Sequence, residues 1–137
     1  MNPSVDIRRY KAVQVTTSSP GELLVALYDG LFRFLRAAET ALAAGDRARG
    51  GENIDRAHAI IGEFAASLES VHAPELCDTL RGLYLFSMER LVEANLHQDA
   101  TYVADVARVL SPLREAFTIV VRQGGAKATD ERVSAHP

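Results

Sequence analysis

Thiol groups are almost absent from this chain: of its 137 residues only Cys77 is a cysteine, so no disulfide can form within it. Long apolar runs are absent too. The most apolar segment, Leu23 to Leu35, is interrupted by charged residues and a glycine and falls short of the ~20 residues that cross a bilayer. The opening residues, Met1 to Asp6, lack the basic and apolar regions of a signal peptide. We therefore expect a cytoplasmic protein without membrane insertion.

Concentrated positive charge is also lacking. The formal net charge is −3, the sequence pI is about 5.8, and the arginines are interspersed with acidic residues. A nucleic-acid interface needs clustered basic side chains that replace the counterions of phosphate groups. We expect no nucleic-acid partner.

Residue patterns for catalysis or metal binding are missing as well. The histidines are scattered over separate segments, without the paired spacing that builds metal sites in helices: His58, His72, His97 and His136. Neither glycine pair follows a strand, so neither forms a phosphate-binding loop. No Cys-His pair can be identified around Cys77, for which a buried thiol is the simplest interpretation. We expect no enzyme, no cofactor and no catalytic, cofactor-binding or metal-binding residue.

The sequence does contain four long helical segments separated by short breaks, and no window shows β alternation. Their predicted bounds are about Pro20 to Ala44, Asp46 to Val71, Pro74 to Leu96 and Asp99 to Arg122. Helix caps are expected at Ser18 or Ser19, at Asp46 and at Asp99, with Gly45 ending the first helix. The short loops favour an all-α fold, an antiparallel up-down four-helix bundle. We expect residues 1–122 to form a single domain, with an extended N-terminal flap over 1–18, and residues 123–137 to form a flexible, disordered tail.

Local irregularities accompany these helices. Gly50 and Gly51 cost up to ~1 kcal/mol each relative to alanine, so the second helix is expected to fray or to begin late. Pro112 lies inside the fourth helix, where we expect a kink near Arg108 or a break. Gly30 has two open interpretations, a close approach between helices or a tolerated glycine.

The first and fourth helices are more apolar than a core seam requires. In the first helix Val25, Tyr28 and Phe32 widen the stripe on one side and Leu23 and Phe34 on the other, so that the apolar arc approaches ~200° where ~100° is enough for a core face. In the fourth helix the stripe is widened by Val103, Leu110 and Phe117. A contiguous exposed apolar surface usually marks a partner site.

A set of residues in this order resembles a known family. It comprises Tyr10, Gln14-Val15, Thr17, Pro20, Glu22-Leu23 and Leu27-Tyr28-Asp29-Gly30, followed by Gly45-Asp46, Leu83-Tyr84, Met88, Arg90-Leu91, Glu93 to Leu96 and Leu113 to Phe117. The pattern resembles that of the flagellar secretion chaperones called FliS and covers roughly Tyr10 to Arg122.

The resemblance implies a cytoplasmic export chaperone that is not an enzyme. By resemblance, such a protein binds the disordered C-terminal segment of flagellin, prevents premature polymerisation and keeps the subunit competent for flagellar type III secretion. The N-terminal segment is expected to pack against the bundle, and the export apparatus is a further candidate partner. The expected partner-binding residues are Ile7, Tyr10, Gln14 and Val15 in the flap, and Val25, Tyr28, Phe32, Tyr84, Val103, Leu110 and Phe117 in the bundle.

Other functions stay open. The run Ala57-His58-Ala59-Ile60-Ile61-Gly62 resembles the Ala-His-x-Leu-Lys-Gly run of histidine phosphotransfer domains, in which His58 would carry a phosphoryl group. Here Ile61 replaces the lysine that would neutralise the phosphate. A bundle that uses its surplus apolar surface to form a homodimer is a further hypothesis.

Overall fold

The computed structural model describes residues 19–69 and 73–135, and for 125–135 it describes the backbone alone. The described residues fold into four helices, α2 (Pro20–Ala43), α3 (Arg47–Ala66), α4 (Pro74–His97) and α5 (Ala100–Ala135), without a strand among them. The predicted all-α fold is confirmed.

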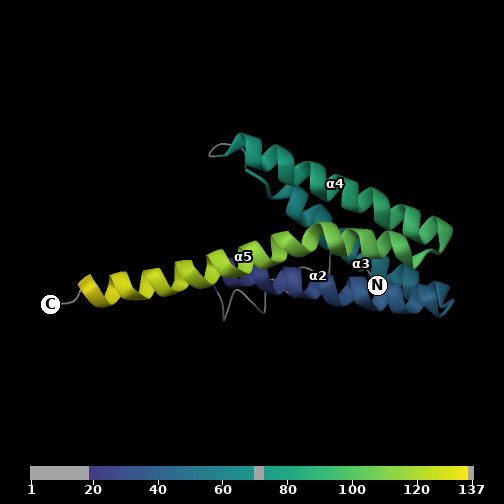
Figure 1. The fold of residues 1–137 in the computed structure, drawn as a ribbon, viewed down its shortest axis with the longest axis horizontal. Helices are drawn as coiled ribbons and strands as arrows, with labels where there is room; N and C mark the ends of the chain where they lie inside the picture. Colours follow the sequence, from purple (N-terminus) through teal and green to yellow (C-terminus); the bar gives the residue numbers. More distant parts are fainter. Residues whose placement is uncertain (1–18, 70–72, 136–137) are drawn as a thin grey trace.

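The helices form a bundle in which each packs against two neighbours. Helix α2 lies against α3 and α5, and α4 lies against the same two helices. Successive helices run in opposite directions (Figure 1). Helices α4 and α5 meet near the turn that connects them and diverge away from it, while the far end of α5 extends past the bundle (Figure 1).

The helix starts follow local capping chemistry. The backbone N–H of Glu22 donates to the Ser19 hydroxyl at 3.2 Å, and that of Arg49 donates to the Asp46 carboxylate at 3.1 Å. Asp99 accepts from both the backbone N–H and the hydroxyl of Thr101, at 2.9 and 2.7 Å. These bonds satisfy donors that a helix leaves unpaired in its first turn. The caps predicted at Ser19, Asp46 and Asp99 are confirmed.

Helix ends differ from the predicted bounds in two places. Helix α3 ends at Ala66, not near Val71; Ser67 is its C-cap, and the Ser67 backbone N–H donates to the Glu63 carbonyl at 3.0 Å. Helix α5 continues to Ala135 instead of ending near Arg122. Most residues beyond the glycine pair there are good helix formers, such as alanine, lysine and arginine. The flexibility of residues 123–137 stays a prediction.

Helix α5 passes through Pro112 without a break. The expectation of a break is therefore wrong. Figure 1 shows α5 changing direction gradually in its middle part, where Pro112 removes one backbone donor and lies exposed at the surface.

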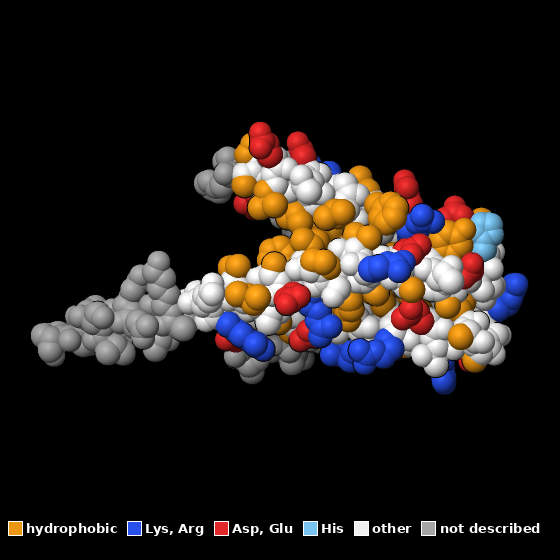
Figure 2. Space-filling view, in the orientation of Figure 1, with side chains coloured by type: hydrophobic (Ala, Val, Ile, Leu, Met, Phe, Trp, Pro, Cys, Tyr) orange, Lys and Arg blue, Asp and Glu red, His pale blue; other side chains and the backbone are white. Residues whose placement is uncertain are grey.

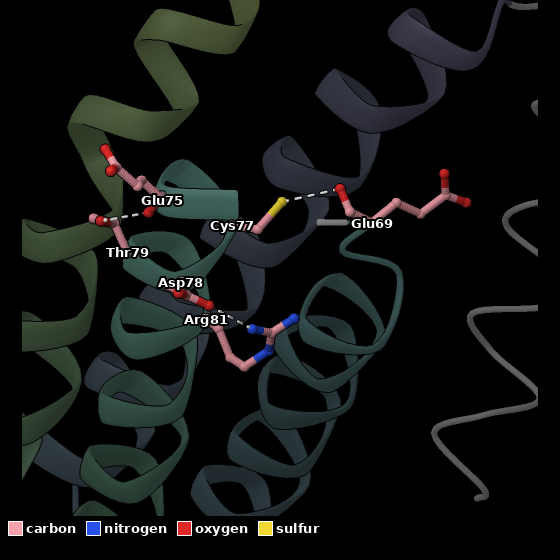
Figure 3. Close-up of polar contacts among 6 residues, drawn as sticks. All are labelled: Glu69, Glu75, Cys77, Asp78, Thr79 and Arg81. Carbon is pink, nitrogen blue, oxygen red and sulfur yellow. Dashed lines mark hydrogen bonds and ion pairs between the residues drawn. The ribbon is translucent and has the colours of Figure 1, made fainter. Parts of the chain in front are cut away.

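A hydrogen bond joins the start of α4 to the segment that follows α3. The buried Cys77 thiol donates to the backbone carbonyl of Glu69 at 3.1 Å (Figure 3). Within α4, Thr79 donates to the Glu75 carbonyl and Arg81 pairs with Asp78, as the same view shows. The thiol is thus a buried structural group, as the sequence predicts.

Gly50 is a point of close approach between α2 and α3. Helix α3 begins at Arg47, so the expected late start is wrong. A Cβ added at Gly50 would lie 2.8 Å from the Leu42 Cδ2 atom, which is closer than real contacts allow, whereas one added at Gly51 would lie 3.5 Å from the Asn95 Oδ1 atom. A Cβ at Gly30 would meet only Arg33 of its own helix within 4 Å among the described residues, which favours a tolerated glycine there.

This contrast predicts opposite effects for two adjacent substitutions. Gly50→Ala forces the buried Leu42 to move and lowers the free energy of unfolding by about 1–3 kcal/mol. Gly51→Ala meets ordinary contact distances and raises the free energy of unfolding by up to ~1 kcal/mol through helix propensity. Urea unfolding of both variants followed by circular dichroism measures the difference. If Gly50→Ala and Gly51→Ala stabilise the protein equally, the close contact between Gly50 and Leu42 does not limit the side chain that α3 can carry at residue 50.

Candidate partner-binding groove

An aromatic cluster with one member from each helix forms the centre of the bundle: Tyr28 of α2, Phe64 of α3, Tyr84 of α4 and Phe117 of α5. The Tyr28 and Phe64 rings stack with centroids 4.5 Å apart, and Phe117 lies 5.6 Å from Tyr28. Phe64 lies 5.8 Å from Tyr84. Such aromatic pairs add to the stabilisation from buried area and tie all four helices together.

A hydrogen bond between two tyrosine hydroxyls crosses this cluster. The Tyr28 and Tyr84 oxygens are 2.5 Å apart, and the two side chains are 0% and 3% exposed. Burial raises the pKa of both hydroxyls, because a buried phenolate would lose its hydration; for Tyr28 the bond to Tyr84 raises the pKa further. The pair therefore stays neutral and fixes the position of α4 relative to α2.

Above the cluster, an apolar groove opens where α4 and α5 diverge. Figure 2 shows hydrophobic side chains gathered in the hollow between these two helices, with charged side chains along its outer edges. On α4 one flank carries Leu76, 58% exposed, and the partly buried Leu83. On α5 the partly buried Leu113 and Val120, which is 62% exposed, lie four residues before and three residues after Phe117 and therefore share its helical face. Phe117 lies beneath them against Tyr28.

The narrow end of this groove is marked by Arg90. Its guanidinium carbon lies 5.3 Å from the ring centroids of both Phe86 on α4 and Tyr102 in the first turns of α5. This contact also fixes which flank of α4 faces α5. Leu76 and Leu83 share that flank, being spaced from Arg90 by fourteen and seven residues, multiples of the heptad repeat.

A second apolar strip lies on the other flank of α4. It consists of Leu85, Val92 and Leu96, which are 50%, 55% and 71% exposed. Met88, on the same side of the helix, lies beside Gly62 of α3. This strip therefore borders α3 and is separate from the groove.

The α2–α5 side of the bundle is closed by an ion pair. The Arg114 Nε and a terminal nitrogen lie 2.9 and 2.7 Å from the same Asp29 carboxylate oxygen, and the guanidinium stacks 4.9 Å from the Phe32 ring centroid. Val25 and Ile119 border the shallow depression around this pair. The half-exposed pair contributes little stability in high dielectric but fixes the angle between α2 and α5.

The predicted partner-binding residues fall into three groups. Ile7, Tyr10, Gln14 and Val15 lie outside the described residues. Tyr28, Tyr84, Val103 and Leu110 are core residues, between 0% and 3% exposed, so that a direct contact would require the bundle to open. Val25, Phe32 and Phe117 are partly exposed, and Phe117 lies at the groove. Binding of a partner to any of them stays a prediction.

Sequence reasoning named Tyr84 on α4 but missed the exposed apolar residues of this helix. Its adjacent apolar residues Leu83-Tyr84-Leu85-Phe86 and the pair Leu91-Val92 place apolar side chains on opposite flanks of one helix. A helix that is apolar on several sides must be covered on several sides. That signal could have pointed to α4 in addition to the first and fourth helices.

The phosphotransfer hypothesis gains no support from this arrangement. His58 is partly buried on α3, and Ile61, at the position of the expected lysine, is 0% exposed in the core. The side chains described up to Gly124 contain no group of three or more potential metal ligands. No helix in the described ranges is long and apolar enough to span a membrane.

Comparison with known proteins gives consistent similarities. The sequence model of the family described as "Flagellar protein FliS" matches residues 4–124. The flagellar secretion chaperone FliS of Bacillus subtilis (strain 168) is 33% identical over 108 residues, 79% of this chain and 80% of the relative. The protein of the same name from Salmonella typhimurium is 34% identical over 104 residues, 75% of this chain and 77% of the relative.

Proposed function

Because the chain belongs to the FliS family of flagellar secretion chaperones, we propose that it binds the disordered C-terminal segment of flagellin in the groove between α4 and α5. Bound there, the segment is kept from polymerising, and the subunit stays competent for flagellar type III secretion. The chaperone acts in the cytoplasm without catalysing a reaction, and the complex is then delivered to the export apparatus.

The observation that carries this proposal is the apolar lining of the groove. Leu76 and Val120 are more than half exposed, and completing the burial of each would stabilise by about 1–2 kcal/mol. A disordered segment that becomes helical on binding must recover its ordering entropy from a large apolar contact. A groove along two helices offers such a contact over several helical turns.

The flap residues fit the same proposal. The apolar side chains among Ile7, Tyr10, Gln14 and Val15 cover part of the bundle surface before flagellin binds. Their segment is too short and mixed in sequence to be stable alone, so it depends on the bundle for its structure.

Titration calorimetry with two forms of flagellin tests the proposal. Full-length flagellin and its isolated C-terminal segment should bind, and flagellin lacking that segment should not. If the truncated form binds with the same affinity as full-length flagellin, the C-terminal segment is not the part that this protein binds. If neither form binds and the protein elutes as a dimer in size-exclusion chromatography, the homodimer hypothesis replaces it.

A further inference from the structure

Three exposed arginines surround a shallow depression on the outside of α2, next to the start of α3. Arg33 and Arg36 of α2 and Arg49 of α3 line it together with small side chains, and its volume is about 410 Å³. Among the described residues no carboxylate forms an ion pair with any of the three, whereas four other arginines each have one. Arginines without such a partner keep their N–H donors available for an anion of another molecule.

A single acidic side chain belongs to the described lining of this depression. Asp46 caps α3 and accepts from the backbone N–H of Arg49 at 3.1 Å, so its carboxylate is already engaged. The nearby Glu52 pairs with Arg56 at 2.7 Å, and Glu39 does not line the depression. With three arginines and one aspartate, the lining has a formal charge of +2, although the whole chain has −3.

The turn between α2 and α3 holds these charges in place. Gly45 has a φ of 77°, the left-handed conformation that ends α2, and the backbone N–H of Asp46 donates to the Ala41 carbonyl at 2.9 Å. The backbone that carries Arg49 is thereby fixed beside the last turns of α2. The depression is therefore formed before any partner binds.

The wall that α2 contributes is suited to a helix. Arg33, Ala37, Thr40 and Ala44 follow one another at intervals of four, three and four residues, so they share one face of α2. The Thr40 hydroxyl donates to the Arg36 carbonyl of the same helix at 3.0 Å and does not project as a free donor. Small side chains between the arginines allow a second helix to approach closely, since the distance between helix axes depends on the side chains at the contact.

We propose that the basic face of α2 and α3, formed by Arg33, Arg36 and Arg49, binds an acidic amphipathic helix of a second protein. Glutamate or aspartate side chains three and four residues apart lie on one face of such a helix and match the charge of the lining. Nucleic acid matches it less well, because duplex binding proteins neutralise many phosphates and this face offers three arginines on a chain of net negative charge.

This site is independent of the flagellin groove. Helix α2 packs against α3 and α5, and α4 lies against the same two helices across the bundle (Figure 1). The basic face lies on the side of α2 opposite its buried residues Leu31, Leu35 and Ala38, and so points away from α4. A partner on this face and a segment in the groove between α4 and α5 can therefore be bound at the same time.

The experiment uses the full chain and a fluorescently labelled synthetic helix of alanines with glutamates at positions i, i+4 and i+7. Fluorescence anisotropy should show about tenfold tighter binding of this peptide than of the same peptide with lysines at those positions. Arg33→Gln/Arg36→Gln should lower the affinity for the acidic peptide about tenfold, because charge-assisted hydrogen bonds are lost. Arg108→Gln/Arg122→Gln removes the same charge from the exposed surface of α5 and should keep the affinity within about twofold of wild type.

The outcomes separate this site from the alternatives. Equal loss in both double variants, with unchanged circular dichroism, would show that net charge and not this face attracts the peptide, and would overturn the proposal. The choice of a protein partner is overturned if phosphatidylglycerol vesicles or a single-stranded oligonucleotide bind through Arg33 and Arg36 more tightly than the acidic peptide.

A competition experiment tests the independence of the two sites. A saturating amount of the flagellin C-terminal segment should leave the affinity for the acidic peptide within about twofold, and displacement of the peptide would overturn the assignment to a separate face. If the flagellin segment does not bind while the acidic peptide does, the proposed function fails and the basic face stands.

Discussion

Aspartate at both Leu76 and Val120 is expected to lower the affinity for the flagellin C-terminal segment by at least about 100-fold. Each side chain loses the energy of completing its burial, ~1–2 kcal/mol, and each new carboxylate must in addition lose water when the segment binds. The free protein should tolerate the changes, because the two side chains are already 58% and 62% exposed. Titration calorimetry measures the affinity, and far-UV circular dichroism measures the fold.

Leu96→Asp provides the matched control. Leu96 is 71% exposed on the same helix as Leu76, but it belongs to the strip that borders α3 and lies outside the groove. Its substitution should leave the affinity within about twofold of wild type. Loss of binding in Leu96→Asp, with the Leu76 and Val120 double variant unaffected, would move the site from the groove to that strip.

The helix starts could be predicted because they depend on local chemistry. Ser19, Asp46 and Asp99 accept hydrogen bonds from residues two or three positions along the chain, and this geometry is contained in the sequence spacing. The end of α3 could not be placed in the same way. Apolar spacing continues beyond Ala66, and helix ends are the least predictable part of a helix, so the sequence pattern alone placed this end several residues too late.

The groove could not be predicted, because its position depends on how two helices diverge. A helical wheel shows that Tyr28 and Phe32 share a wide apolar arc, but it cannot tell which flank is covered by a neighbouring helix. In the structure Tyr28 is completely buried against Phe64, whereas Phe32 is partly exposed beneath Arg114. Residues on the same stripe thus have different environments, set by tertiary packing and not by periodicity.

A large effect on the free energy of unfolding is expected from removing one of the two hydrogen-bonded hydroxyls in the core, those of Tyr28 and Tyr84. Tyr84→Phe should lower the free energy of unfolding by about 1–3 kcal/mol, because it leaves the Tyr28 hydroxyl buried without a hydrogen-bond partner. Removing the other hydroxyl as well, in Tyr28→Phe/Tyr84→Phe, should restore most of the stability, since no unpaired polar group remains. Urea unfolding of the two single variants and the double variant gives the coupling energy.

The same pair predicts a loss of stability in alkali. Both hydroxyls have a raised pKa in the folded protein, so the folded state keeps protons that the unfolded state releases above its ordinary pKa of about 10. The contribution of these two hydroxyls to the free energy of unfolding is therefore fully present below pH ~10. It falls as the pH rises further, by up to about 1.4 kcal/mol per pH unit for each tyrosine. The double phenylalanine variant should lose this part of the slope. Identical alkaline slopes in wild type and the double variant would mean that the two hydroxyls are hydrated in solution, and that the centre of the bundle opens toward the groove far more readily than its close packing indicates.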